Sequence, residues 1–295
     1  MLNFRKISID DKAIYDKYRS KCEINASEGA FATVFIWNEF YNAAVADDDE
    51  FFYIRFNKKN TAPEFLFPVG IGDVKSALRK IEAVCEERGE SLKFALLTKE
   101  QADIVTEFFG DAAQVVSDRD CADYVYLTEK MINLSGKKLH SKKNHLNYFL
   151  QNYKFEFVEV SGGELLDKCA EKAYQLVNGK EKNKNSYEIG AMHSYFENFD
   201  ALDQKGCAII IDGAVAAMSF GEKLCDDYAL IQIELANDAF RGAYQAINKL
   251  FLENYWSEFK YVNREEDMGI DGLRKAKMSY RPEFLVEKYF IAIND

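Results

Sequence analysis

The chain has 295 residues, of which 48% are hydrophobic and 29% charged, a balance typical of globular proteins with one large or two ordinary domains. Its 3 prolines and 16 glycines exclude a collagen-like or linker-dominated chain. The formal net charge of −11 argues against a general nucleic-acid scaffold protein, because such proteins carry a basic surface.

Export, membrane insertion and metal binding find no support in the sequence. The longer uncharged runs, such as 29–38 and 213–221, are about ten residues long, well short of the ~20 that a membrane-spanning helix needs. The first ten residues lack the apolar stretch of a signal peptide. The closest two of the six cysteines, Cys207 and Cys225, are 18 residues apart. We therefore expect reduced thiols, no metal site and a cytoplasmic location.

Helical and strand patterns alternate along the whole chain, which predicts an α/β or α+β fold. In the first half, two aromatic-rich strands flank a polar connection at 57–62 and predict a hairpin. We expect helices over about 10–21, 31–41, 74–88 and 99–109, and strands over 51–56, 64–67, 93–97 and 123–127.

The second half repeats this alternation of elements. Asp212-Gly213 between two apolar runs is a strong hairpin signal. A polar loop is expected over 178–186 and a turn-rich loop over 237–242. We expect helices over about 137–153, 163–177, 191–200, 243–256 and 270–278, and strands over 155–160, 207–211, 214–222, 228–235, 261–263 and 284–291.

Basic residues concentrate in three stretches of this acidic chain. Residues 135–155 carry five lysines and no acid, 180–184 carry three lysines and one acid, and 260–281 carry six basic and four acidic residues. If these stretches converge, they would form one basic surface that attracts an anionic ligand, and added salt would weaken this attraction. Lys138, Lys142 and Lys143 could then grip a phosphodiester backbone; alternatively they form an ordinary solvated face.

The order hairpin, long strand, turn, helix, strand, helix, strand in the second half is that of the acyl-CoA N-acyltransferase fold, the Gcn5-related acetyltransferase architecture. In that fold the helix after the long strand binds the pyrophosphate of coenzyme A at its N-terminus, where backbone N–H groups and the helix dipole favour an anion. Arg241 and Gly242 occupy this position here. The alternative for Gly242 is an ordinary turn glycine.

Three segments resemble the phosphatidylglycerol lysyltransferase C-terminal domain family: 261–282, 136–149 and 240–248. The resemblance implies two tandem acyltransferase-like domains, over 1–135 and 136–295, each with a mixed central sheet flanked by helices. The best-known members of the family transfer an aminoacyl group from aminoacyl-tRNA to a phosphatidylglycerol headgroup. The resemblance therefore implies aminoacyl-tRNA or acyl-CoA as the donor substrate. It also implies an amine, hydroxyl or lipid headgroup as the acceptor, and no required cofactor.

Residues 263–277 supply candidate ligands for an anion. Asn263 and Arg264 lie at the carboxyl end of a short strand, where open α/β sheets bind ligands. Arg264 could bind a phosphate or carboxylate through two parallel hydrogen bonds, or pair internally with a neighbouring acid. Arg274 and Lys277 are three residues apart on one helix, so they could meet one anion together or form a solvated face.

Two residues are candidates for proton transfer. Gln232 and Glu234 alternate within a strand, so both should point to one face, with Glu234 as a general base for an amine acceptor. Its alternative is a buried Glu bonded to the backbone or to Arg264. Tyr280 occupies the region where acyltransferase-like folds place a Tyr general acid; its alternative is a packed Tyr before Pro282.

These residues predict an acyl or aminoacyl transferase in which the acceptor attacks the ester or thioester carbonyl directly. The strands 228–235 and 261–263 should diverge beyond their start to admit the donor, with free N–H groups in the loop 238–242. The alternative is a non-catalytic module that binds a nucleotide or tRNA and retains the fold.

Overall fold

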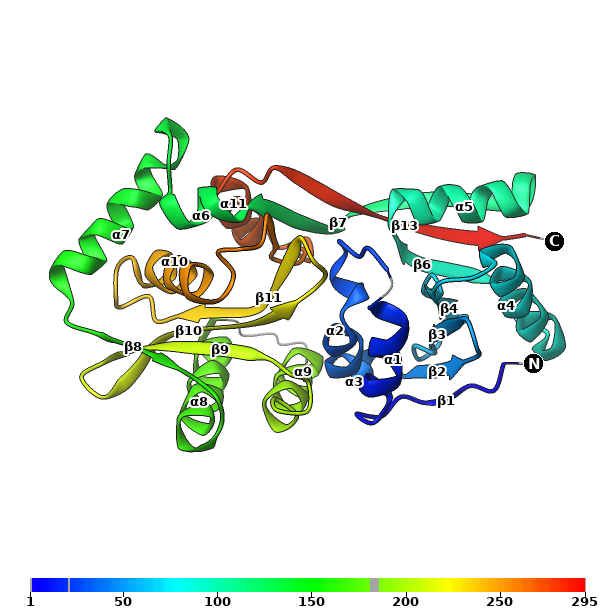
Figure 1. Cartoon of the computed structure of the whole chain (residues 1–295), viewed down its shortest axis with the longest axis horizontal. Helices are drawn as coiled ribbons and strands as arrows, with labels where there is room; N and C mark the ends of the chain where they lie inside the picture. Colours follow the sequence, from blue (N-terminus) through cyan, green and yellow to red (C-terminus); the bar gives the residue numbers. More distant parts are fainter. Residues whose placement is uncertain (1, 21, 181–185, 295) are drawn as a thin grey trace. The chain divides into compact units, whose positions relative to one another are not determined.

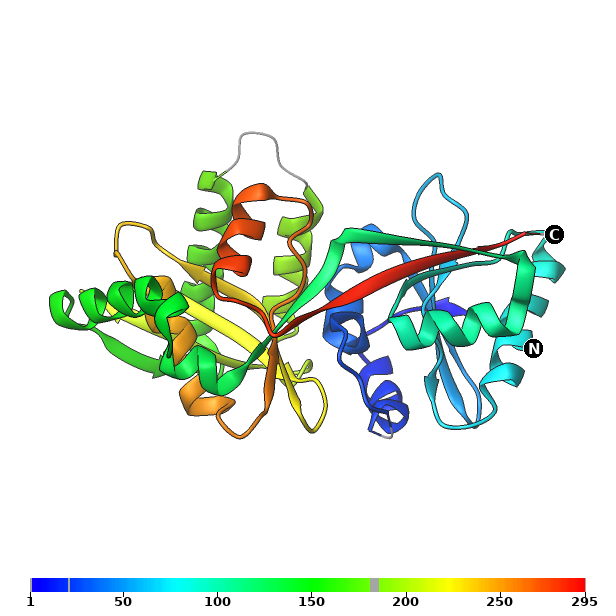
Figure 2. The same cartoon turned by 90° about the horizontal axis from the view of Figure 1, so that it is seen from above.

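The structure is a computed structural model that describes residues 2–20, 22–180 and 186–294. By contacts the chain divides into unit 1, residues 1–122 with 286–295, and unit 2, residues 123–285. The expected border between residues 135 and 136 therefore falls inside unit 2. The strand β7 (Ala113–Leu127) passes from the first unit into the second, and the last strand β13 (Phe284–Ile293) returns to unit 1 (Figure 2).

Unit 1 contains a mixed sheet in the order β1-β2-β3-β4-β6-β13-β7, with β5 paired to β3. The predicted hairpin is confirmed, because β3 and β4 pair antiparallel. The strand β2 was not expected from its alanine-rich sequence. The strands are β1 (Arg5–Lys6), β2 (Ala43–Asp47), β3 (Phe51–Phe56), β4 (Glu64–Phe65), β5 (Val69–Gly70) and β6 (Lys93–Leu97).

The helices of unit 1 follow the expected positions, except that the helix expected over 31–41 is divided into two at Trp37. Asp73 caps α4 by accepting from the Lys75 N–H, and Gly89 ends it in a left-handed conformation. Thr98 and Gln101 form a capping box at the start of α5. The helices are α1 (Asp11–Arg19), α2 (Phe31–Ile36), α3 (Asn38–Tyr41), α4 (Val74–Arg88) and α5 (Lys99–Phe109).

The elements of unit 2 also follow the predicted order. A short 3-10 turn over Lys137–Leu139 leads into α7, and α9 begins earlier than expected. Of the predicted loop 178–186 and the basic stretch 180–184, residues 181–185 lie outside the described residues. The helices are α6 (Thr128–Asn133), α7 (His140–Asn152), α8 (Gly163–Lys180), α9 (Ser186–Glu197), α10 (Ala243–Tyr255) and α11 (Asp271–Ser279).

The sheet of unit 2 has the order β7-β12-β11-β10-β9-β8. The hairpin of β9 and β10 is confirmed, and β11 pairs with β12 in parallel. Helices α7 and α10 lie on one face of the sheet, and α8 and α9 lie on the other (Figure 1). The new strands are β8 (Glu156–Glu159), β9 (Lys205–Ile211), β10 (Ala214–Lys223), β11 (Tyr228–Ala236) and β12 (Tyr261–Asn263).

The core beneath α10 positions the candidate site. Ala246, Ile247 and Phe251 of α10 are fully buried against the sheet, together with Ile231 of β11 and Val262 of β12. Because these side chains are apolar and close-packed, the polar residues at the rim of the core are held in one arrangement.

Candidate active site in unit 2

The strand β11 extends beyond its three residue pairs with β12. Tyr228, Ala229 and Leu230 pair with residues 261–263 of β12, whereas β11 continues to Ala236. Because β12 pairs with β11 over its whole length, the predicted divergence applies only to the chain beyond Asn263. There the main chain follows β7, since the Arg264 N–H donates to the Tyr124 carbonyl, while the Arg264 side chain reaches Glu234 of β11.

A β-bulge interrupts β11 at Gln232. Phe220 of β10 pairs with Ile233 and the next residue, Gly221, pairs with Ile231, so Gln232 is an extra residue on its strand. Gly221 has no room for a side chain, since a Cβ there would lie 2.0 Å from the carbonyl oxygen of Leu230.

The bulge shows that the prediction of one shared face for Gln232 and Glu234 is wrong. The Gln232 amide donates to Glu222 (3.3 Å), which also accepts from Gln204, a partner of Tyr195 in α9. Glu234 instead contacts Asn248 of α10, on the opposite face. Beyond the bulge the side chains of β11 alternate again, but shifted by one residue. Gln232 and Glu234 therefore point to opposite faces of the sheet and join separate hydrogen-bond networks.

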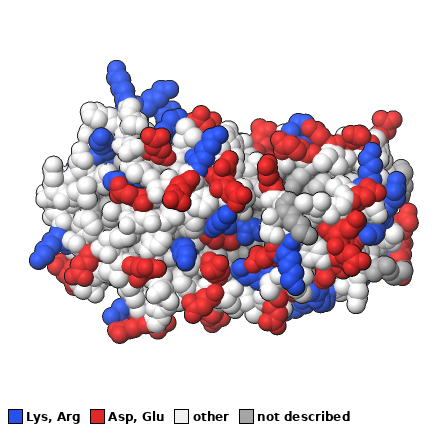
Figure 3. All heavy atoms as spheres, in the orientation of Figure 1, with Lys and Arg blue, Asp and Glu red and all other residues white. Residues whose placement is uncertain are grey.

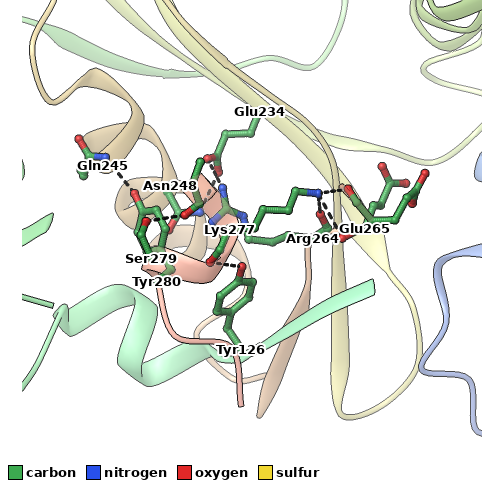
Figure 4. A network of polar contacts seen from close by, with 11 residues as sticks. Tyr126, Glu234, Gln245, Asn248, Arg264, Glu265, Lys277, Ser279 and Tyr280 are labelled. Atoms are coloured by element: carbon green, nitrogen blue, oxygen red, sulfur yellow. Dashed lines mark hydrogen bonds and ion pairs between the residues drawn. The ribbon is translucent and has the colours of Figure 1, made fainter. Parts of the chain in front are cut away.

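Both carboxylate oxygens of Glu234 are engaged (Figure 4). Arg264 Nη2 donates to one oxygen at 2.6 Å, and Asn248 Nδ2 donates to the other at 2.7 Å. The side chains of Glu234 and Arg264 are 7% and 12% exposed. This arrangement favours the alternative of a buried Glu–Arg pair over a free general base, because a general base needs an open oxygen facing its substrate.

The basic helix α7 and the stretch 264–281 meet at Tyr280. The guanidinium carbon of Arg264 lies 5.2 Å from the centre of the Tyr280 ring, and Lys142 Nζ lies 4.3 Å from the same centre. Burial and the neighbouring Arg264 both lower the pKa of Lys142 from its ordinary value. The predicted convergence of the two basic stretches is thus confirmed for Lys142.

Tyr280 is a buried phenol that retains a proton to donate. Its side chain accepts a hydrogen bond from Gln245 Nε2 at 3.0 Å, and the residue is 6% exposed. Burial raises the pKa of Tyr280 to about 12, although Arg264 acts in the opposite direction. At neutral pH the hydroxyl is therefore protonated, as a general acid requires.

Three predicted anion ligands instead build the loop after β12. Asn263 donates to Asp123 (2.8 Å) and accepts from the Glu265 N–H (2.7 Å). Arg274 forms two hydrogen bonds with the buried Asp267, at 2.8 and 2.6 Å. Lys277 donates to backbone carbonyls. The prediction that Arg274 and Lys277 meet one anion together is not supported, because both side chains donate their hydrogen bonds to groups within the chain.

Gly242 is required by close packing between α10 and α7. It has φ +91°, and a Cβ there would lie 2.1 Å from the carbonyl oxygen of His145. The N–H of Ala243 donates to the carbonyl of Phe240, so the predicted free donor at this helix start is absent at Ala243. Arg241 is exposed, and its guanidinium stacks on the Tyr148 ring at 4.6 Å.

Gly242→Ala should destabilise unit 2 by several kcal/mol, because left-handed strain of about 1–3 kcal/mol adds to a clash with backbone. The free energy of unfolding in urea would measure the loss. Gly213→Ala is the matched control: it has φ +77° but open space around its Cβ, so it should carry the strain alone. Equal losses in both variants would contradict the packing role of Gly242.

Lys138, in the 3-10 turn before α7, and Lys143, in the first turns of α7, are exposed. In Figure 3 basic side chains gather where α7 begins in Figure 1, while acidic and basic residues are mixed over the remainder of this unit's visible face. These two lysines are therefore available to a polyanion, whereas Lys142 lies deeper at Tyr280.

Gln245 and Asn248 were missed by the sequence analysis. They are three residues apart on α10, within a helix whose neighbouring positions are apolar, so they share one face. Polar residues on the buried stripe of an amphipathic helix were the signal that could have identified them.

Membrane-spanning helices and metal-binding clusters are both absent from the described residues. In residues 2–20, 22–180 and 186–294, no helix is long and apolar enough to cross a membrane. The same residues contain no group of three or more His, Cys, Asp or Glu that could hold a metal ion.

The architecture places the chain among tandem proteins of the acyl-CoA N-acyltransferase fold. A solved tandem GNAT protein from the clavulanic acid biosynthesis pathway covers 100% of this chain, and the match spans 99% of that chain, with a TM-score of 0.50 at 8% identity. L-PGS from Bacillus licheniformis is closer in structure, with a TM-score of 0.71, 12% identity, and coverage of 96% of this chain and 92% of that one. Both similarities concern the fold.

Residues 19–292 match the family model described as phosphatidylglycerol lysyltransferase, C-terminal, and the chain belongs to this family. The predicted resemblance is thereby confirmed. A conserved protein of unknown function from Bacteroides thetaiotaomicron has a TM-score of 0.93 at 27% identity, and the match covers 100% of both chains. An uncharacterized protein from Mycoplasmoides gallisepticum is 28% identical over 181 residues, 58% of this chain and 56% of that protein. The chain thus matches about half the length of this relative.

Proposed function

We propose that this protein is an aminoacyltransferase that moves an aminoacyl group from aminoacyl-tRNA to an amine or hydroxyl acceptor. Membership in a family named for a lysyltransferase supports a transferase activity. The observation that carries the proposal is the meeting of the Lys142 and Arg264 side chains at the ring of Tyr280, beside the carboxyl end of β12.

In this reaction the acceptor nitrogen or oxygen attacks the ester carbonyl of the donor and forms the new bond directly. Negative charge develops first on the carbonyl oxygen, where Lys142 would stabilise it. The ester carbon–oxygen bond then breaks, and Tyr280 donates its proton to the departing ribose oxygen. The attacking nitrogen or oxygen loses its own proton, directly or through water, to the Tyr280 phenolate, which regenerates the neutral phenol. No covalent enzyme intermediate is needed, so positioning and electrostatics supply most of the rate.

Three of the backbone donors before α10 are already bonded within the loop, which weakens the case for an acyl-CoA donor there. A pyrophosphate site at this position would need free backbone donors. Here the N–H groups of Ala239 and Phe240 donate to Asn237, and that of Ala243 donates to Phe240. The acid-free start of α7 offers lysines to a phosphodiester backbone instead.

The double variant Lys138→Glu/Lys143→Glu should weaken tRNA binding, and the slope of log affinity against log salt should fall by about 1.5–2 for two lost phosphate contacts. Filter binding over a range of salt concentrations would measure both effects. Lys168→Glu/Lys205→Glu changes the net charge equally at exposed sites elsewhere in unit 2 and should leave the slope unchanged. Equal loss in both double variants would contradict a local tRNA surface on α7.

The proposed function is tested by incubating the protein with labelled aminoacyl-tRNA and, separately, labelled acetyl-CoA, with cell extract as the source of acceptor. We expect label to move from aminoacyl-tRNA to an acceptor. Transfer from acetyl-CoA alone would identify the other donor class. Donor binding without any transfer would instead support a binding module that retains the fold.

A further inference from the structure

The ammonium group of Lys277 is enclosed by three consecutive backbone carbonyls (Figure 4). Lys277 Nζ donates to the carbonyl oxygen of Arg264 at 2.6 Å, to that of Glu265 at 3.1 Å, and also to that of Glu266. An ammonium group has three N–H donors, so its hydrogen-bonding capacity is filled by the chain itself. Lys277 is therefore unsuited to bind a substrate directly.

The backbone that supplies these carbonyls is bent sharply. Glu265 has φ 55°, a left-handed conformation that costs a non-glycine residue about 1–3 kcal/mol unless the surroundings hold it. The side chain of Asn263 accepts from the Glu265 N–H at 2.7 Å and supports the bend from one side. Three carbonyl dipoles that converge on one point repel one another, and the positive charge of Lys277 offsets this repulsion.

The main chain of Lys277 is linked to the other side of the site. Its carbonyl oxygen accepts from the Tyr126 hydroxyl at 2.9 Å and from the Tyr280 N–H at 3.1 Å. One residue thus holds the backbone of Arg264 through its side chain and the backbone of Tyr280 through its carbonyl. The guanidinium of Arg264 in turn contacts the ring of Tyr280.

We propose that Lys277 is a positioning residue whose ammonium group acts as a tethered cation, holding the loop 264–266 in the conformation that places Arg264 against Glu234 and Tyr280. The proposal deepens the proposed function and rests on it only where activity is concerned. Burial lowers the pKa of Lys277. The link should therefore weaken at a lower pH than the pH at which an exposed lysine loses its charge.

The test is Lys277→Ala followed by replacement of the missing cation. Hydrogen exchange of the Arg264 and Glu265 amides, which donate to Tyr124 and Asn263, reports on the loop without any assay of transfer. We expect exchange at both amides to accelerate at least tenfold and to slow again when n-propylammonium is added at millimolar concentration. Tetramethylammonium, which has no N–H donor, should not restore protection. Lys275→Ala, at an exposed position of α11, should exchange like the wild type.

Unchanged exchange in Lys277→Ala, or equal restoration by tetramethylammonium, would overturn the proposal. If that variant does not fold, acetylation of the native protein by acetic anhydride decides instead: Lys277 should react at least tenfold more slowly than Lys275, and equal reactivity would overturn the proposal. A wild-type protein that transfers nothing would contradict the proposed function. The exchange experiment would still test the role of Lys277, because it does not depend on transfer.

Discussion

Tyr280→Phe is expected to lower the rate of transfer by 10²–10⁴-fold while donor affinity and stability change little. The substitution removes only the hydroxyl, which accepts from Gln245 and supplies the proposed proton. The ring remains to contact Lys142 and Arg264. Single-turnover kinetics with preformed aminoacyl-tRNA would separate this loss from any change in binding.

Tyr255→Phe is the matched control, since it removes a hydroxyl from a half-buried Tyr at the end of α10. It should keep the wild-type rate. Because the pKa of Tyr280 is raised to about 12, its protonated form should persist through neutral and moderately alkaline pH and be lost only as the pH approaches that value. Full turnover in Tyr280→Phe would exclude its role as the acid.

Glu234→Gln is expected to destabilise unit 2 by about 3–5 kcal/mol, because it leaves the buried guanidinium of Arg264 without a compensating charge. Urea unfolding would measure the free energy lost. The double variant Glu234→Gln/Arg264→Met should recover much of it, since an apolar side chain then replaces the unpaired cation.

The same variant distinguishes the two roles considered for Glu234. If it is a general base, transfer per folded molecule should fall 10²–10⁴-fold in Glu234→Gln with stability preserved. If Glu234 instead pairs with Arg264, the free energy of unfolding should fall in Glu234→Gln. Asn248→Ala should then lower the free energy of unfolding by a smaller amount, because it removes the second partner of the carboxylate. Wild-type stability in Glu234→Gln would contradict the ion-pair role.

Much of the fold of unit 2 could be predicted because its signals are local. The Asp212-Gly213 turn, the apolar run of β11 and the helix after Gly242 each depend on a few neighbouring residues, and their order defines the fold. The meeting of Lys142 with the 264–281 stretch followed from an unusual separation of charges along the chain. Local pattern and charge distribution were sufficient for these conclusions.

The remainder depends on partners that are distant in sequence. Nothing near Arg274 identifies Asp267 as a bidentate partner rather than a phosphate, and nothing near Lys277 reveals three converging carbonyls. The strand β7 was expected only over 123–127, because residues 113–120 are largely exposed and lack the alternation that marks a half-buried strand. Long-range geometry decides such cases.

The bulge at Gln232 makes the length of β11 as important as its composition. Deleting Gln232 would remove the bulge and restore regular pairing, because Gly221 already pairs with Ile231 and Phe220 with Ile233. The later residues would keep their partners in β10, so Glu234 would stay on the face of α10, within reach of Arg264. An extra residue between Ile233 and Glu234 would instead turn Glu234 toward α9 and separate it from Arg264 without altering either residue. In related sequences we therefore expect loss of the bulge residue to be tolerated more readily than a further insertion before Glu234.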